Sequence, residues 1–238
     1  MLISVGIALL FVTLMLLIWY PQPYFRASGA DQLLTILIGV DVVIGPLLTL
    51  VVFKSGKKTL KFDLGVIGFL QIAALVYGAS IVWQARPVFL VFAVDRFVLV
   101  AANELSDEDL SQAELPQFKS LSWTGPRVVG TKRPTTIQER NQLLFSSVFE
   151  QKDIDRMPKY YIPFEEQDGD LHNRVIPLDK LLSRDAGTRD LITRALHKAG
   201  REKDQVGYLP LLARKFYMAM LVDKTSGVPL SAVHVDPW

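Results

Sequence analysis

The sequence has 238 residues, a formal net charge of +2 and no cysteine. The absence of cysteine excludes a disulfide framework and a thiolate zinc site, and the small net charge does not favour nucleic-acid binding. Half of the residues are apolar, a high share for a soluble protein of this length, and most of the long apolar runs lie before residue 87.

The chain opens with an uncharged apolar run over residues 1–20. Its length favours a first membrane-spanning helix, with Trp19 and Tyr20 at the level of an interfacial aromatic belt and Pro21 ending the helix. The alternative is a cleaved signal peptide with its cleavage site at Ala27-Ser28-Gly29. The run is long for such a peptide and lacks a basic start, so we expect the spanning helix.

Two further apolar runs cover residues 33–53 and 63–83, and each would cross about 30 Å of hydrocarbon. Four lysines follow the first of these runs: Lys54, Lys57, Lys58 and Lys61. By the positive-inside rule these lysines determine the topology, with their loop in the cytoplasm and the chain beyond residue 86 outside. We therefore expect three N-terminal transmembrane α-helices in residues 1–86, followed by a mixed α/β domain on the outer side of the membrane in residues 87–238.

Polar residues inside the expected spans are candidate contacts with a partner. Asp41 lies near the middle of the second span, shortly before Gly45-Pro46, and Gln71 lies inside the third. A buried aspartate costs about 3 kcal/mol on insertion scales, so Asp41 should face protein or water. Three roles remain open for it: packing within the helix bundle, contact with the membrane helix of a partner, and a proton relay.

The pattern after residue 86 predicts a small mixed sheet with helices on one face. Strands are expected at 88–94 and 97–102, near 128–129, and as a hairpin of 215–222 with 228–235. Helices are expected at 103–115, 136–151, 175–184 and 188–200, with Ser106 capping the first.

The sequence shows no set of residues typical of catalysis. The three histidines, His172, His197 and His234, have no metal-ligand spacing, and the acidic segment 165–170 lacks the spacing of a calcium loop. Zinc-protease, serine-hydrolase and phosphate-loop motifs are absent from the sequence. We therefore predict a binding protein rather than an enzyme, with no cofactor and no metal.

Several segments together resemble a known family. They are Trp19-Tyr20-Pro21, the stretch GVDVVIGPLLTLVVFKSGKKTLKFDLGVIGFLQIAALVYG, the following WQARPVFLVFAVDRF, Thr124-Gly125-Pro126-Arg127, and LVDKTSGVPL near the terminal Asp236-Pro237-Trp238. The chain resembles the type IV pilin accessory proteins of the TfpX/TfpZ type, also called pilin assembly chaperones.

The resemblance implies a multi-pass bacterial inner-membrane protein with its C-terminal domain in the periplasm. Such a protein would bind and stabilise a specific type IV pilin, through the pilin's membrane helix and globular head, before pilus assembly. The family defines no catalytic residues and no pilin contacts by motif. Two other classes stay open: a membrane-anchored periplasmic enzyme or sensor, and a structural subunit of the pilus assembly machine.

Overall fold

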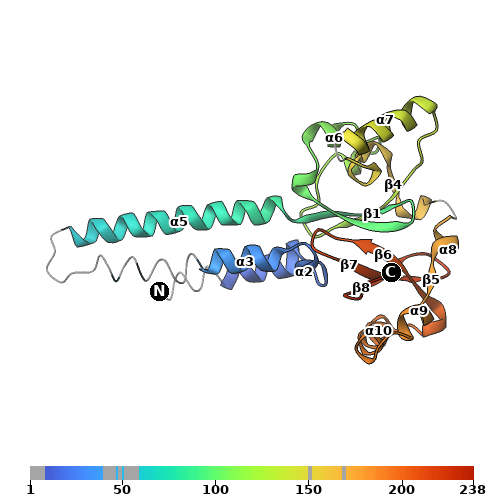
Figure 1. Cartoon of the computed structure of the whole chain (residues 1–238). Helices are drawn as coiled ribbons and strands as arrows, with labels where there is room; N and C mark the ends of the chain where they lie inside the picture. The colour runs from blue at the N-terminus through green and yellow to red at the C-terminus, as the bar shows by residue number, and fades with distance from the viewer. Residues whose placement is uncertain (1–8, 40–46, 48–49, 51–58, 150–151, 168–169) are drawn as a thin grey trace.

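The computed structural model describes residues 9–39, 47, 50, 59–149, 152–167 and 170–238 (Figure 1). The long helix α5 (Leu60–Gln84) projects from a domain built on a β-sheet. Beside the domain end of α5 lie three short N-terminal helical segments. They are Leu9–Trp19, which ends in the π-helix η1 (Met15–Trp19), then α2 (Tyr24–Ala27) and α3 (Ala30–Gly39).

The expectation of three N-terminal transmembrane helices is wrong. Among the described residues only Gly65–Gln84, within α5, is long and apolar enough to cross a membrane, whereas Leu9–Trp19 and Ala30–Gly39 are shorter. Met15 at the end of the first apolar run is fully buried against Val82 of α5, so this run packs onto a neighbouring helix. The second expected span falls on α3, which ends at Gly39, and on residues that are mostly outside the described ranges.

The domain contains an eight-stranded mixed sheet in the order β4-β3-β1-β2-β6-β7-β8, with β5 also paired to β6. The strands are β1 (Pro87–Ala93), β2 (Arg96–Ala101), β3 (Arg127–Thr131), β4 (Tyr161–Pro163), β5 (Ile176–Pro177), β6 (Val206–Leu212), β7 (Tyr217–Asp223) and β8 (Pro229–Val233). β1 pairs in parallel with β3 and β2 with β6, and the other pairs are antiparallel. The strands predicted near 88–94, 97–102 and 128–129 and the C-terminal hairpin are confirmed.

The central strand β6 was not predicted from the sequence, and it contains Pro210, a residue type that is rare in the middle of a sheet. One edge of β6 pairs fully with β7. The other edge is shared, since β5 pairs with Gly207 and Tyr208 and β2 pairs with Leu211 and Leu212. Pro210 therefore lies between these two partners, where the missing N–H interrupts no continuous ladder.

The domain helices are α6 (Asp107–Ser111), α7 (Ile137–Phe149), α8 (Asp170–Arg174), α9 (Asp179–Leu182) and α10 (Ala186–Ala199). Short 3-10 turns are η3 (Ala102–Glu104), η4 (Pro116–Phe118), η5 (Ile154–Arg156), η6 (Pro158–Tyr160), η7 (Phe164–Glu166) and η8 (Lys203–Gln205). Ser106 caps α6 by accepting a hydrogen bond from the backbone N–H of Asp109, as expected. The helix expected over 175–184 is wrong at its start, because Ile176 and Pro177 pair with β6 as β5.

Both faces of the sheet are buried, not one. On β1, Phe89 and Val91 pack into one core cluster with Leu110 of α6, while Leu90 and Phe92 pack into another on the opposite face. That second cluster also receives Ala27 of α2 and Leu171 of α8. Alternation along a strand places neighbours on opposite faces, so a strand covered on both sides reads as the continuous apolar run seen in β1.

Candidate functional site

A site of connected polar and aromatic side chains lies where α5 enters the sheet. Three segments far apart in the sequence meet there, and we call this place the joint. It consists of Trp19, Tyr20, Pro21, Trp83, Arg86, Ser122, Trp123 and Gly125. All three segments carry motifs on which the family resemblance depends.

Arg86 is the centre of the joint and is almost completely buried, with 4% of its surface exposed. Its guanidinium carbon lies 3.4 Å from the centroid of the Trp83 ring, and its Nη1 donates to the carbonyl oxygen of Trp83 at 2.7 Å. Its Nε donates to the carbonyl oxygen of Ser122 at 3.2 Å. Burial lowers the pKa of Arg86, and the guanidinium still stays charged because its ordinary value is far above neutrality.

Three tryptophans connect the segments through ring contacts centred on Trp83. The ring centroids of Trp19 and Trp83 lie 4.9 Å apart in an edge-to-face arrangement, and those of Trp83 and Trp123 lie 5.1 Å apart. Such pairs contribute about 1 kcal/mol each beyond the area they bury. Trp83 therefore contacts the N-terminal segment, the loop before β3 and the arginine at once.

Tyr20 fixes the N-terminal segment to α5. Its side chain is fully buried, and its hydroxyl donates to the carbonyl oxygen of Val82 at 2.7 Å. The wide turn of η1 is closed by the backbone N–H of Tyr20, which donates to the carbonyl oxygen of Met15 at 2.8 Å. Burial raises the pKa of Tyr20 well above its ordinary range, so the hydroxyl stays a donor.

Gly125 allows the loop before β3 to approach Pro21. Its φ of +70° is in the left-handed region, which a side chain disfavours. A Cβ atom at this position would lie 3.0 Å from Cγ of Pro21. Glycine is therefore required for both its backbone conformation and the close contact.

A second connection ties the N-terminal segment to the sheet. Nζ of Lys215 lies 3.2 Å from the Asp31 carboxylate, and the backbone N–H of Lys215 donates to the carbonyl oxygen of Ala27 at 3.1 Å. Desolvation opposes ionisation of Asp31, but the hydrogen bonds from Lys215 and from backbone N–H groups, together with the charge of Lys215, outweigh it and lower the pKa of this carboxyl. The segment is thus held at both ends, by Tyr20 and by Asp31.

Comparison with known proteins identifies the family. The chain is 28% identical over 241 residues to the fimbrial assembly protein of serogroup I from Dichelobacter nodosus, which covers 100% of this chain and 93% of the relative. It is 33% identical over 114 residues to the fimbrial assembly protein of serogroups C1 and C2 from the same organism, covering 47% of this chain and 87% of the relative. The chain belongs to the fimbrial assembly protein family. No family model and no solved structure matches it.

Family membership confirms the general part of the resemblance, a relation to pilus assembly. The narrower TfpX/TfpZ assignment stays a prediction. The contacts of the joint hold the apolar helix α5 in a fixed position relative to the sheet.

Most of the residues predicted as partner contacts or topology determinants lie outside the described ranges. Asp41, Gly45 and Pro46 lie outside the described residues, as do Lys54, Lys57 and Lys58. Gln71 lies partly buried on α5, about 16 Å along the helix from Val82 at 1.5 Å per residue, and Lys61 lies in the first turn of α5. The importance of Arg86 was missed, since an arginine at the end of an apolar run reads as an ordinary flanking charge.

The third apolar run contains small residues that let a neighbouring helix approach closely. A Cβ atom at Gly78 of α5 would lie 2.3 Å from Cδ1 of Leu37, so α3 packs closely against α5 there. No heavy atom lies within 4 Å of the corresponding position at Gly65 or Gly68. The glycines near the start of α5 thus leave an open surface among the described residues.

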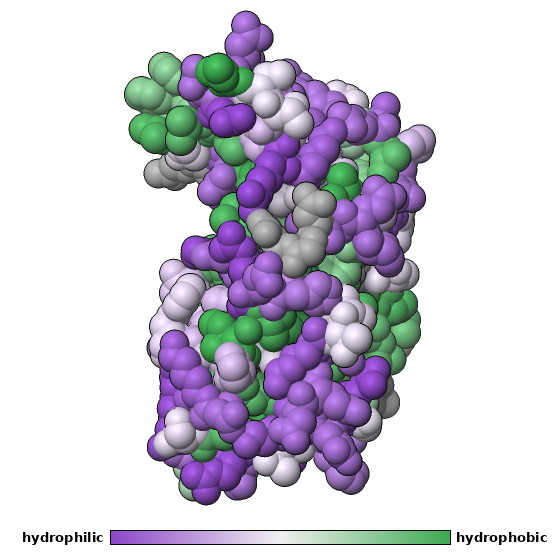
Figure 2. Space-filling model, turned by 90° about the vertical axis from the view of Figure 1, so that its right-hand side faces the viewer, coloured by the Kyte–Doolittle hydropathy of each residue, from purple (hydrophilic) through white to green (hydrophobic). Residues whose placement is uncertain are grey.

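Helix α7 presents a second apolar surface. It contains no buried residue, and Leu144, Phe145, Val148 and Phe149 are each more than 60% exposed. Leu143 of this helix is partly buried and packs against the core cluster that contains Phe89 and Val91 of β1. Figure 2 shows the domain from the side opposite α5: polar side chains cover most of this face, and apolar ones gather at its upper left, at the height of α7, and again in its lower half.

Proposed function

We propose that this fimbrial assembly protein is a membrane-anchored accessory protein, of the TfpX/TfpZ type, that binds a type IV pilin subunit before pilus assembly. Two relatives from Dichelobacter nodosus that are named fimbrial assembly proteins align with the whole length of the chain. The proposal adds three statements to that: an anchor, an orientation and a client.

The anchor is α5. Its candidate span of 20 residues matches the roughly 30 Å of a bilayer's hydrocarbon core. Large apolar side chains point outward all along it, with Phe69, Ile72 and Tyr77 each more than 60% exposed. A core helix of a soluble protein would be mostly buried, whereas 11% of this span is buried inside the protein. Lipid is the environment that fits such a surface.

The orientation rests on the charges that flank α5. Four lysines precede the candidate span, which begins at Gly65: Lys54, Lys57, Lys58 and Lys61, the last of them in the first turn of α5. The positive-inside rule therefore favours a cytoplasmic start for α5 and a periplasmic sheet domain. Reporter fusions at Gly56 and at the C-terminus should report opposite compartments, and a cytoplasmic C-terminus would contradict this orientation.

The joint is the observation that supports a pilin client and carries the proposal. An unassembled pilin has one apolar helix in the bilayer and a globular head outside. Arg86, Trp83 and Tyr20 hold the α5 helix and the sheet domain as one unit, so both parts of such a client meet a surface at a fixed spacing. Two weak contacts on one scaffold gain affinity through effective concentration.

Deletion of the gene tests the client directly. The proposal expects less pilin in the membrane and fewer pili, both restored by the full-length chain. Unchanged pilin levels and piliation in the deletion strain would contradict it. Purified pili that contain the chain in stoichiometric amounts would instead identify a structural subunit.

A further inference from the structure

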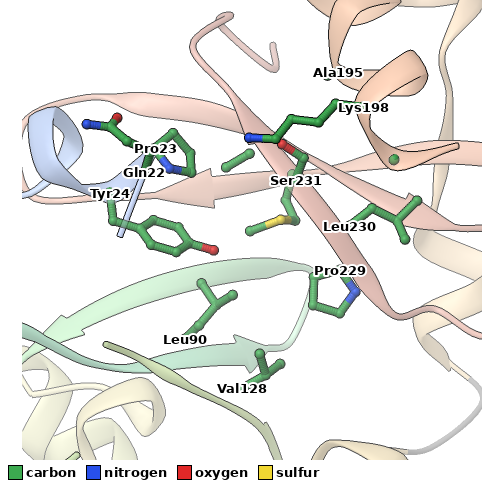
Figure 3. Close-up of a pocket in the computed structure, with 13 residues that line it drawn as sticks. Gln22, Pro23, Tyr24, Leu90, Val128, Ala195, Lys198, Pro229, Leu230 and Ser231 are labelled. Carbon is green, nitrogen blue, oxygen red and sulfur yellow. The ribbon is translucent and has the colours of Figure 1, made fainter. Parts of the chain in front are cut away.

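The sheet curls so far that strands on its two halves face each other across a cavity. Leu90 on β1 and Met220 on β7 line one cavity of about 270 Å³, although β2 and β6 separate their strands in the sheet (Figure 3). We call this cavity the sheet groove. Its volume lies just below the roughly 300–1,000 Å³ of small-molecule sites, so it suits a side chain better than a cofactor.

Two incompletely paired strand edges border the groove. β4 pairs with residues 129–131 of β3, which leaves Val128 beyond the end of that ladder, and Val128 is 38% exposed. On the other side β8 is the last strand of the sheet order and contributes Pro229, Leu230 and Ser231 to the lining. An open strand edge next to a pocket that can seat a side chain is the arrangement by which domains bind an extended peptide as an added strand.

The polar groups of the groove have one sign of charge. Among the described residues that line the groove, Lys198 of α10 carries the charge, and none is acidic. Figure 3 shows its amine near Ser231 and the hydroxyl of Tyr24 directed into the groove. Burial raises the pKa of Tyr24 to about 12, so this hydroxyl remains a hydrogen-bond donor at neutral pH. The groove therefore presents donors and a cation around an apolar floor.

We propose that the sheet groove binds an extended segment of the pilin head. An apolar side chain of that segment seats over Leu90 and Met220, a neighbouring carboxylate side chain pairs with Lys198, and its backbone runs along β8. This inference rests on the proposed pilin client. Its location supports it: Gln22, Pro23 and Tyr24 line the groove immediately after Pro21 of the joint, so the site lies beside the base of α5.

Site-specific photocrosslinking in pilin-producing cells tests the groove. The full-length chain would carry p-benzoylphenylalanine in place of Val128 or Leu230, with matched positions Leu144 on α7 and Leu191 on α10 as controls, both exposed apolar residues. We expect a crosslink to pilin, detected with anti-pilin antibody, from the two groove positions and not from the controls.

Other outcomes separate the groove from the proposed function. Pilin that co-purifies with the wild-type chain but crosslinks only at Leu144 would overturn the groove and identify α7 as the docking surface. Pilin that neither co-purifies nor crosslinks anywhere would overturn both. A crosslink to a second copy of the chain from both groove positions would replace the pilin segment by self-association.

A charge reversal gives a second, independent readout. Lys198→Glu should reduce the groove crosslink about fivefold or more, because it replaces attraction by repulsion at the rim, while Lys198→Arg should preserve it. Lys180→Glu on α9 makes the same change at another exposed position outside the lining and should have no effect. Equal crosslinking by Lys198→Glu and wild type would overturn the assigned carboxylate partner.

Discussion

The guanidinium carbon of Arg86 lies 3.4 Å from the centre of the Trp83 ring, and the same guanidinium donates a hydrogen bond to the Trp83 carbonyl. One side chain thus contacts both the ring and the backbone at the last turn of α5 and reaches the Ser122 carbonyl in the loop before β3. A helix with an apolar surface and the sheet domain are thus joined directly at this point.

Replacing Arg86 should loosen this connection. Arg86→Ala removes two hydrogen bonds and a buried cation–π contact, and we expect a loss of about 3 kcal/mol in unfolding free energy. Arg86→Lys should recover little of it, since an ammonium cannot reproduce the planar fork. Thermal unfolding in detergent measures the effect, with exposed Lys119→Ala as control. Equal melting temperatures for Arg86→Ala and wild type would show that the joint contributes no stability.

Tyr20→Phe isolates the hydroxyl of the buried tyrosine. The variant keeps the ring and leaves the Val82 carbonyl without this donor, so the expected loss is about 1 kcal/mol. Tyr77→Phe provides the matched control, because the Tyr77 side chain is 69% exposed on α5, the helix that carries Val82. Chemical denaturation of both variants should separate them; a smaller effect at Tyr20 than at Tyr77 would be inconsistent with the hydrogen bond.

Gly125→Ala combines an unfavourable backbone conformation with a tight contact to Pro21. Gly200→Ala has a similar positive φ, +61°, but nothing lies within 4 Å of the added Cβ. We expect Gly200→Ala to cost about 1 kcal/mol from the left-handed backbone alone, and Gly125→Ala to cost more. The difference between the two melting temperatures measures the contact, and a difference of zero would mean that Pro21 simply moves aside.

Asp155 predicts a pH dependence of stability. Burial raises the pKa of its carboxyl, and Arg156 only partly opposes this. The folded protein therefore holds this proton more tightly than the unfolded chain, so the contribution of Asp155 to stability falls as the pH rises from about 4 through the raised value. Asp155→Asn should be more stable than wild type at pH 7 and similar below pH about 4. Pulse proteolysis across this range checks it, and a variant less stable than wild type at pH 7 would reverse the assignment.

Strands with continuous apolar runs were predictable from the sequence, whereas their order was not. β1 and the β7–β8 hairpin follow from run length and turn residues, and α10 follows from its periodicity and Gly200. β6 was not predicted. It contains Pro210, which is tolerated because β2 and β5 pair with separate parts of one edge of this strand. The three-span expectation failed because run length does not reveal packing: Met15 and Tyr20 are buried against the end of α5.

Some residues of the candidate site lie in motifs visible in the sequence, but neither their role as a site nor its geometry was predicted. Trp19-Tyr20-Pro21 and Thr124-Gly125-Pro126-Arg127 were identified as motifs, and a sequence gives no sign that they meet at Arg86. The contact between Pro21 and Gly125 joins positions more than a hundred residues apart, which only the fold of the sheet brings together.

The most direct measurement of the account is the amount of pilin recovered with the tagged full-length chain from detergent-solubilised membranes of pilin-producing cells. The account predicts that pilin co-purifies with the wild-type chain. It also predicts that much less pilin co-purifies with the Trp83→Ala/Arg86→Ala double variant at equal chain levels in the membrane, because the helix and the sheet domain lose their fixed spacing. Wild-type chain recovered from the membrane without pilin would contradict the account.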